Sequence, residues 1–499
     1  MAIEHFDVVV MGAGLSGIGA GYHLQTECPD RSYVILEARD AIGGTWDLFR
    51  YPGVRSDSDM FTLGYRFRPW TGAKALADGE SIRDYIRETA RAFGIDRHIR
   101  YGHRVRGIGW SSADARWTVE VDTPDGPRTI TCGFFLGCSG YYDYVRGYTP
   151  DFEGAAAFEG RIVHPQFWPE DLDVAGKRVV VIGSGATAVT LVPALAGGGA
   201  YVTMLQRSPS YVVAMPAEDG FARRMRSWLP GRLAQRVIRV RSIVVQIAFY
   251  RLARWRPAAT RTRIAAMAQA RLGPGYDVGT HFTPRYDPWD QRMCLVPDGD
   301  LFDAIRTGAA TVVTDRIARF TPHGLVLESG GELPADIVVT ATGLEILVLG
   351  GVMVKVDGEA VDLASRYSYK GLMFSDVPNL ALVFGYTNAS WTLRADLASE
   401  YVCRLLNVMR RRGMRQATPH IGTTPMSPLP FVDFSSGYIA RAAGKLPKQG
   451  DRRPWRMRQN YVADWIGLRF GRVDRDLVIS NPSPIRQKEL LGSGNRDAS

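Results

Sequence analysis

A glycine-rich turn near the start of the chain constrains the fold most strongly. Residues 12–17 read Gly-Ala-Gly-Leu-Ser-Gly and lie between an apolar strand pattern and a helical pattern. In such a turn Gly12 permits the sharp bend, Gly14 lets a pyrophosphate approach the backbone, and Gly17 lets helix and strand pack closely. Glu37 ends the next strand pattern, where an acid binds ribose hydroxyls. The pattern predicts a dinucleotide-binding βαβ unit, and its place at the N-terminus favours FAD.

A second turn of this kind lies in the middle of the chain. Residues 183–188 read Gly-Ser-Gly-Ala-Thr-Ala after a strand pattern, and the next strand pattern ends in Gln206-Arg207-Ser208 instead of an acid. An acid would repel a 2′-phosphate, whereas Arg207 and Ser208 would hold it by charge-assisted hydrogen bonds. This favours NADPH over NADH; the alternative for Arg207 is a solvated surface charge. The predicted contacts are Gly183, Ser184, Gly185, Ala186, Thr187, Ala188, Arg207 and Ser208.

Two such units predict an α/β protein with two Rossmann-like dinucleotide-binding domains, and 499 residues suffice for them. We expect a discontinuous FAD-binding domain, an NADPH-binding domain and an arginine-rich helical insert in the latter. Their predicted bounds are 1–144 with 345–499, 145–212 with 290–344, and 213–289.

Periodicity predicts the elements around the two units. Residues 84–94 and 393–411 have helical patterns. Residues 104–132 alternate apolar and polar side chains, which predicts a β-meander, and residues 134–137 are expected to form a separate buried strand.

The net charge of +10 is concentrated in one segment. Residues 221–276 contain thirteen arginines and no Lys, Asp or Glu, so the rest of the chain has a net charge of −3. The apolar run 242–250 is too short to cross a bilayer. A basic helix with an aromatic face suits an anionic membrane surface, so we hypothesise peripheral membrane contact through residues 221–256. The alternative is a solvated insert packed on the cofactor domain. We expect no nucleic-acid partner, because no reading motif accompanies the charge.

Five scattered cysteines, none in a C-x-x-C pair, predict free thiols in a reducing compartment. They also argue against a dithiol redox enzyme. The first residues lack the basic region of a signal peptide, so a cytoplasmic location is expected. We expect no metal site.

Residues 43–59 form a polar, glycine-containing stretch after the first unit. Gly43 and Gly44 allow close backbone approach. Trp46 is expected to cover the isoalloxazine or ribityl chain, and Asp57 to face the flavin. The alternatives are a core tryptophan and a turn or cap residue.

Residues between the two units match F-x-G-x-x-x-H-x-x-x-W-P. Taken alone, a single histidine in such a turn is more often structural than catalytic. The whole pattern, however, resembles the fingerprint of type I Baeyer–Villiger monooxygenases; related N- and S-oxygenating enzymes carry Tyr or Phe where this chain has Trp168. The fixed positions are Phe158, Gly160, His164, Trp168 and Pro169.

The resemblance covers nearly the whole chain and is weakest in the helical insert and the C-terminal tail. It is closest to the ethionamide-activating branch of the family, which oxidises ketones and thioamide or thioether sulfur. The stretches that carry it are GGTWDLFRYPGVRSDSD, IGSGATAVTLVPAL, MLQRSP, PWDQRMCLVPDGDLFDAIR, ADIVVTATG, GYTNASWTLRADL and LPKQG.

The resemblance implies an FAD-dependent, NADPH-consuming monooxygenase that acts through a C4a-(hydro)peroxyflavin. It would insert one oxygen of O2 into a ketone to give an ester or lactone, and oxidise organosulfur substrates. Arg292 matches the family's arginine that stabilises the peroxide and the Criegee intermediate, and Asp57 the acid that positions it. Without the resemblance, Arg292 would be a surface or ion-pair residue.

The resemblance also implies further cofactor contacts. Gln291 departs from better-known relatives, which place a lysine there to help grip the 2′-phosphate; this leaves Arg207 as the main anchor. The implied residues are Ser16, Glu37, Thr45, Trp46, Asp47, Leu48, Asp57 and Val105 for FAD, and Arg55 and Ser56 for NADPH.

Three alternatives stay open. One is an N- or S-oxygenating monooxygenase without Baeyer–Villiger activity. Trp168 argues against this alternative. The second is an NADPH oxidase or flavin reductase, and the third a non-catalytic FAD-binding protein.

Overall fold

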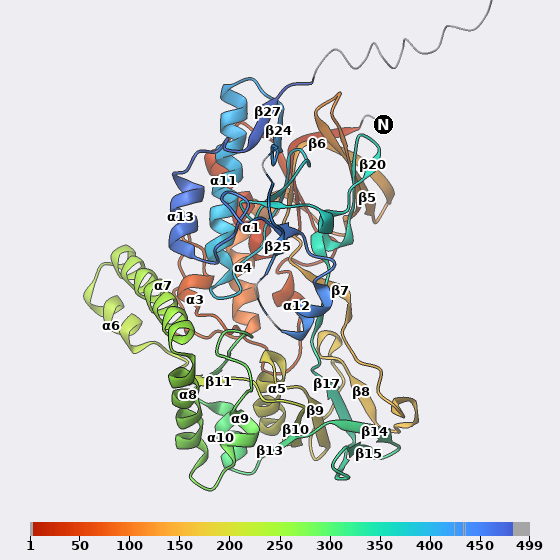
Figure 1. The fold of residues 1–499 in the computed structure, drawn as a ribbon, viewed down its shortest axis with the longest axis vertical. Helices are drawn as coiled ribbons and strands as arrows, with labels where there is room; N and C mark the ends of the chain where they lie inside the picture. Colours follow the sequence, from red (N-terminus) through yellow and green to blue (C-terminus); the bar gives the residue numbers. More distant parts are fainter. Residues whose placement is uncertain (1–2, 424, 433, 435, 483–499) are drawn as a thin grey trace, which may run out of the picture.

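The computed structural model describes residues 3–423, 425–432, 434 and 436–482. Figure 1 shows an elongated molecule with one sheet in its upper half and a second sheet in its lower half. The predicted fold class, α/β with Rossmann-like units, is confirmed.

The first sheet has nine strands in the order β20-β19-β4-β5-β6-β1-β2-β3, with β23 paired to β6. Its N-terminal strands β1, β2 and β3 pair in parallel, as a βαβ unit requires, while β4, β5 and β6 form an antiparallel meander. The strands are β1 (Glu4–Met11), β2 (Tyr33–Leu36), β3 (Ile99–Arg100), β4 (Arg104–Ser111), β5 (Arg116–Thr123), β6 (Gly126–Gly137), β19 (Met353–Val356), β20 (Glu359–Ala360) and β23 (Leu380–Leu382).

The second sheet has five strands in the order β13-β10-β9-β17-β8, and every pair is parallel. Its strands are apolar almost throughout, as expected where both faces are covered. They are β8 (Arg161–Val163), β9 (Arg178–Ile182), β10 (Tyr201–Gln206), β13 (Ala310–Thr314) and β17 (Ile337–Thr340).

Short strands complete the structure. β7 and β18 pair where the chain passes between the two sheets, and β11 pairs with β12. These short strands are β7 (Tyr142–Gly147), β11 (Val212–Met215), β12 (Cys294–Pro297), β14 (Ile317–Thr321), β15 (Gly324–Leu327), β16 (Glu332–Pro334), β18 (Leu344–Ile346), β21 (Ser368–Tyr369), β22 (Met373–Phe374), β24 (Gln416–Pro419), β25 (Leu429–Pro430), β26 (Lys448–Gln449) and β27 (Leu477–Ser480).

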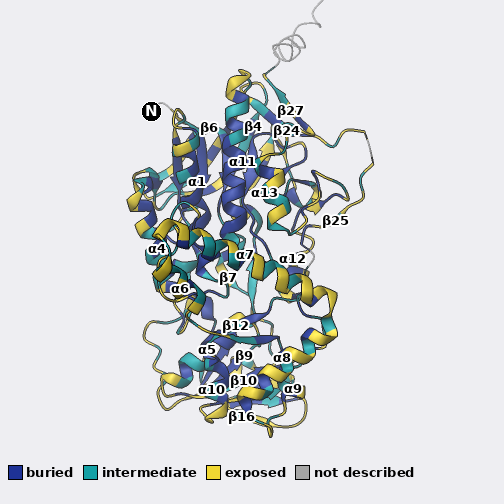
Figure 2. Ribbon diagram, turned by 90° about the vertical axis from the view of Figure 1, so that its left-hand side faces the viewer, coloured by how far each residue is buried: buried dark blue, intermediate teal, exposed yellow. Residues whose placement is uncertain are grey.

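Helices cover the sheets and form the insert. Figure 2 shows α1 and α11 buried beside the first sheet, whereas α6, α7 and α8 carry many exposed residues. The helices are α1 (Leu15–Glu27), α2 (Thr45–Leu48), α3 (Met60–Leu63), α4 (Gly79–Ala92), α5 (Ala186–Gly197), α6 (Gly220–Trp228), α7 (Gly231–Trp255), α8 (Pro257–Leu272), α9 (Val278–Phe282), α10 (Asp300–Arg306), α11 (Trp391–Arg411), α12 (Gly437–Ala442) and α13 (Tyr461–Arg469).

Strand β1 shows why the first unit folds as it does. Its side chains alternate between two faces, as in any strand. Val8 and Val10 pack into the core formed with α1 and α11, whereas Val9 and Met11 pack against the meander. A strand buried on both faces has to be apolar at every position.

One expected boundary is wrong. Residues 134–137 are not a separate strand, because β6 runs without a break through Gly133 and pairs with β1 along most of its length. The expected helices are present, although both begin a few residues earlier than their patterns suggested.

The domain bounds stay a prediction, which the sheets support. The first sheet takes strands from residues 4–137 and 353–382, and the second from residues 161–340. The insert is helical except for β11, whose partner β12 follows the insert. Within the part of the chain that the structure describes, no helix is both long and apolar enough to span a membrane.

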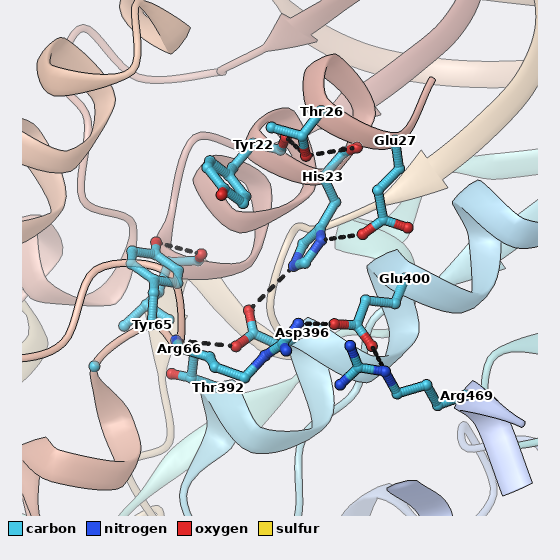
Figure 3. Close-up of polar contacts among 12 residues, drawn as sticks. Tyr22, His23, Thr26, Glu27, Tyr65, Arg66, Thr392, Asp396, Glu400 and Arg469 are labelled. Carbon is cyan, nitrogen blue, oxygen red and sulfur yellow. Dashed lines mark hydrogen bonds and ion pairs between the residues drawn. The ribbon is translucent and has the colours of Figure 1, made fainter. Parts of the chain in front are cut away.

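A charge network joins α1 to α11 (Figure 3). His23 contacts Glu27 at 2.9 Å through Nδ1 and Asp396 at 3.5 Å through Nε2. Arg66 donates its backbone N–H to Asp396 and its side chain to Glu400. Burial lowers the pKa of His23, but the two carboxylates outweigh it and raise that pKa to about 9. The pairing of charged His23 on α1 with Asp396 on α11 therefore holds the two helices together.

Candidate active site

Both glycine-rich turns open into one cavity of about 880 Å³, lined by the ends of second-sheet strands and by loops that follow strands of the first sheet. A site between two α/β units, at the carboxyl ends of their strands, is where dinucleotides bind in this architecture. The cavity therefore places two nucleotide sites next to each other.

The first turn fits a pyrophosphate. Gly12 has a φ of 105°, and a Cβ there would lie 2.7 Å from the carbonyl oxygen of Cys138. A Cβ on Gly17 would lie 1.8 Å from the carbonyl oxygen of Gly12, so helix and strand touch. α1 begins after Gly14 without a side-chain cap, which leaves its first N–H groups available to an anion.

The second turn repeats this geometry. Gly183 has a φ of 142°, and a Cβ there would lie 2.4 Å from the carbonyl oxygen of Ala341. α5 begins after Gly185 without a side-chain cap, and a Cβ on Gly185 would meet nothing within 4 Å. Ser184 donates to the carbonyl oxygen of Ser208, which ties the turn to the end of β10. This turn too leaves room for a phosphate at a helix N-terminus.

Arg207 and Ser208 line the cavity just after β10, and Arg207 is exposed. Arg316 lines the same part of the cavity, after the neighbouring strand β13. Among the described residues, neither arginine makes a side-chain ion pair, so both side chains are available to a 2′-phosphate. Sequence reasoning missed Arg316, although the parallel pairing of Gln206 with Thr314 puts both arginines at one sheet edge.

Arg292 and Asp57 meet in the cavity. The guanidinium donates through Nε and Nη2 to the two carboxylate oxygens, the second at 2.7 Å, and reaches Ser58 Oγ at 3.2 Å. Both side chains keep about a third of their surface or less exposed, at 33% and 27%. Burial lowers the pKa of Arg292, but the Asp57 carboxylate outweighs it and holds that pKa above its ordinary value. The pair presents a fixed positive charge to the cavity.

Tyrosines form a wall of the cavity that sequence reasoning missed. The hydroxyls of Tyr141 and Tyr142 lie 2.8 Å apart, and burial raises the pKa of each. Burial also raises the pKa of Tyr144 to about 12. These phenols therefore stay neutral donors at physiological pH. They lie within the run Tyr141-Tyr142-Asp143-Tyr144 at the start of β7, a local cluster of tyrosines that the sequence could have indicated.

The cavity also receives part of the predicted FAD set. Thr45 and Trp46 line it, and Ser16 accepts a hydrogen bond from Trp391 Nε1 at 2.7 Å. Arg55 and Ser56 line it as well, with the Arg55 side chain paired to Asp300.

Other predicted FAD residues do not line the cavity. Glu37 is buried and accepts from the N–H of Ala13 at 2.7 Å, so it braces the first turn. Burial raises the pKa of Glu37, against the opposing effect of its backbone hydrogen bonds. Asp47 is buried and paired with arginines on either side of it in sequence. The residues outside the lining are Gly12, Gly17, Glu37, Asp47, Leu48, Val105 and Ala188.

The fingerprint histidine lies at the crossing between the two sheets, not in the cavity. His164 Nε2 lies 3.1 Å from the carbonyl oxygen of Gly343, and its Nδ1 accepts from the N–H of Gln166. A Cβ on Gly147 would lie 2.0 Å from the imidazole ring. Burial lowers the pKa of His164, which favours the neutral ring. His164 thus holds together the two segments that connect the sheets.

The other fingerprint residues pack around the second sheet. Phe158 is buried against Phe320, and a Cβ on Gly160 would lie 2.4 Å from the carbonyl oxygen of Asp336. Trp168 packs against the core of the second sheet, and Pro169 follows it. The fingerprint is therefore an architectural signature in this structure.

Comparisons with known proteins agree with this architecture. Residues 75–254 match the flavin-binding monooxygenase-like family, and residues 10–78 match the NAD(P)-binding Rossmann-like domain. The chain is 56% identical to the FAD-containing monooxygenase EthA of Mycolicibacterium smegmatis, over 95% of this chain and 96% of that protein. It is 52% identical to the EthA protein of Mycobacterium tuberculosis, over 97% and 99%.

Solved structures share the fold at low sequence identity. An oxidized steroid monooxygenase bound to NADP has a TM-score of 0.73 at 21% identity, covering 96% of this chain and all of the other. The OTEMO complex with FAD and NADP has a TM-score of 0.69 at 19% identity, covering 84% and 87%. The predicted family and the predicted FAD are confirmed, and the NAD(P)-binding Rossmann-like match agrees with a nicotinamide cofactor. The chain belongs to the FAD-containing monooxygenases, flavin-binding enzymes that consume O2 and act on small organic molecules.

Proposed function

We propose that this enzyme inserts one oxygen atom of O2 into ketones, giving esters or lactones, and oxidises thioamide and thioether sulfur. The observation that carries the proposal is the position of Arg292, which Asp57 holds in the cavity that both glycine-rich turns line. A guanidinium is always charged and donates in a fixed fork, which suits an oxyanion that develops on a substrate carbonyl.

The residues of the cavity are assigned three roles. Ser16, Thr45 and Trp46 would hold FAD, which supplies the oxygen-activating chemistry once NADPH has reduced it. Arg207 and Ser208 would hold the 2′-phosphate of NADPH. The tyrosine wall limits water and donates hydrogen bonds, so the Arg292 charge acts in a medium of lowered polarity.

The Baeyer–Villiger assignment draws on the fingerprint with Trp168, which distinguishes this chain from N- and S-oxygenating relatives. Its ketone and sulfur substrates follow from the resemblance to the ethionamide-activating branch. A cytoplasmic location is proposed from five cysteines that are all buried, free thiols.

Product analysis tests the proposal. The holoenzyme is incubated with NADPH, O2 and a panel of linear, cyclic and aryl ketones, thioethers and thioamides, and products are identified by mass spectrometry. Esters or lactones are expected from at least one ketone class, together with S-oxides. S-oxides without any ester would assign an N- or S-oxygenating enzyme instead. NADPH consumption with only hydrogen peroxide formed would assign an oxidase.

A further inference from the structure

Helix α7 has its apolar side facing outward. Surface helices normally turn an apolar stripe to the core and polar residues to water. In α7 the large apolar side chains recur at helical spacing on the exposed side, with Val240 60% and Trp255 71% exposed. The exposed apolar residues of α7 are Leu233, Val240, Val244, Val245, Phe249, Leu252 and Trp255.

The inward side of α7 is bound to the protein through the buried Ile238 and through polar groups. Arg239 donates to the carbonyl oxygens of Phe61 and Gly64 at 3.0 and 2.7 Å. Gln246 donates to Thr62 Oγ1 at 3.0 Å. Since these hydrogen bonds fix the rotation of the helix, its apolar stripe is held outward and is not available to the core.

Arginines surround this stripe, and only some of them pair with acids, as Arg241 does with Asp219 and Arg254 with Asp290. In the part of the chain that the structure describes, the exposed side chains of five arginines of α6 and α7 and their flanks make no ion pair. These are Arg224, Arg232, Arg236, Arg251 and Arg256. Positive charge around an apolar strip matches a layer of anionic headgroups over acyl chains.

Two tryptophans stand at the ends of the stripe. Trp228 precedes α7 and Trp255 ends it, and each is 71% exposed. Arg224 lies over the ring of Trp228 and Arg256 over that of Trp255, at 5.6 and 4.4 Å. Tryptophan beside arginine is the combination that is enriched at the boundary between headgroups and acyl chains.

A second helix extends this side of the molecule. α13 exposes Val462 and Ile466, and Phe470 directly after it is also exposed; the three are spaced four residues apart and thus lie on one side. Figures 1 and 2 place α13 and α7 on the same side of the molecule. The apolar surface therefore comes from two parts of the chain that are distant in sequence.

We propose that the outward side of α7, with α13 beside it, binds the surface of an anionic lipid bilayer. The apolar side chains enter the headgroup boundary and the arginines contact the lipid phosphates. A second copy of the chain fits this surface poorly, because a symmetric interface would bring the same arginines face to face. The structure thereby narrows the sequence-based hypothesis for residues 221–256 to one helix face.

Vesicle flotation of the holoenzyme tests this proposal. Vesicles of phosphatidylcholine with phosphatidylglycerol are compared with vesicles of phosphatidylcholine alone, at low and high salt. We expect flotation only with the anionic vesicles, weakening as salt screens the charges. Each removed arginine should lower binding about fivefold.

Matched variants separate this surface from others. The test variant carries Val244→Gln and Trp255→Gln, and its control carries Val478→Gln and Tyr201→Gln, which are 51% and 71% exposed elsewhere. Arg232→Gln with Arg236→Gln is compared with Arg319→Gln. Loss of flotation in the test variants alone, with the bound-FAD spectrum unchanged, supports the proposal.

Three results would overturn it: no flotation with any vesicle, equal flotation of test and control variants, or equal binding to neutral vesicles. A dimer in sedimentation velocity that the stripe variants dissociate, without vesicle binding, would assign the surface to a second copy instead.

Discussion

Arg292 and Asp57 are separated by 235 residues in sequence, yet the guanidinium of one donates two hydrogen bonds to the carboxylate of the other. The acid comes from the loop after α2, and the arginine from the segment before β12. Because each belongs to the region of a different nucleotide-binding turn, the pair connects the two halves of the site. The position of the arginine thus depends on both halves.

Asp57→Asn tests this dependence. The amide keeps the size of the side chain but loses the charge and one acceptor, so Arg292 keeps a hydrogen bond to Ser58 and loses its fixed position. We expect oxygenated product to form about tenfold to a hundredfold more slowly, the cost of misplacing a catalytic group. Stopped-flow measurement should show NADPH reducing the flavin at a nearly unchanged rate. An equal loss in both half-reactions would assign Asp57 to cofactor binding.

Arg207→Ala tests the nicotinamide end of the cavity. Loss of a charge-assisted hydrogen bond to the 2′-phosphate should raise KM for NADPH about tenfold to a hundredfold and leave KM for NADH unchanged. Arg316→Ala should shift the same ratio in the same direction, since it lines the same part of the cavity. Arg319→Ala, an exposed neighbour on β14, is the control. A parallel rise for both cofactors would contradict a 2′-phosphate contact.

The charge network around His23 predicts a pH dependence of stability. The pKa of His23 is raised from 6.5 to about 9 in the folded protein. Its contribution is therefore complete below pH 6.5 and is lost as pH rises through about 9. In thermal unfolding of the holoenzyme, His23→Gln should lower Tm most near pH 6, and the difference from the parent should shrink toward pH 9. The exposed His323→Gln is the control. A difference that is constant with pH would mean that His23 acts through packing alone.

The two nucleotide units could be predicted because their signals are local. A strand, a glycine turn and a helix within about 30 residues specify one βαβ unit, and the positive φ values of Gly12 and Gly183 follow from that turn. The break expected before residue 134 was wrong because a glycine such as Gly133 interrupts an apolar pattern without interrupting strand pairing.

The rest of the site depends on contacts between distant segments. The place of His164 could not be predicted, since it depends on where the chain returns at Gly343. The tyrosines of the wall are adjacent in sequence, at 141, 142 and 144, but their place in the cavity depends on the tertiary fold. For the insert, composition indicated a basic surface, but only the inward hydrogen bonds of Arg239 and Gln246 show which side of α7 faces outward.

The most direct test of the central claim is single-turnover product analysis of Arg292→Ala, with Arg285→Ala, an exposed arginine nearby, as control. Flavin reduction by NADPH and ketone oxygenation are measured on the same holoenzyme. Removal of one preorganised charged donor should slow ester or lactone formation about a hundredfold to a thousandfold while the flavin is still reduced. Ester formation by Arg292→Ala at the parent's rate would contradict the account.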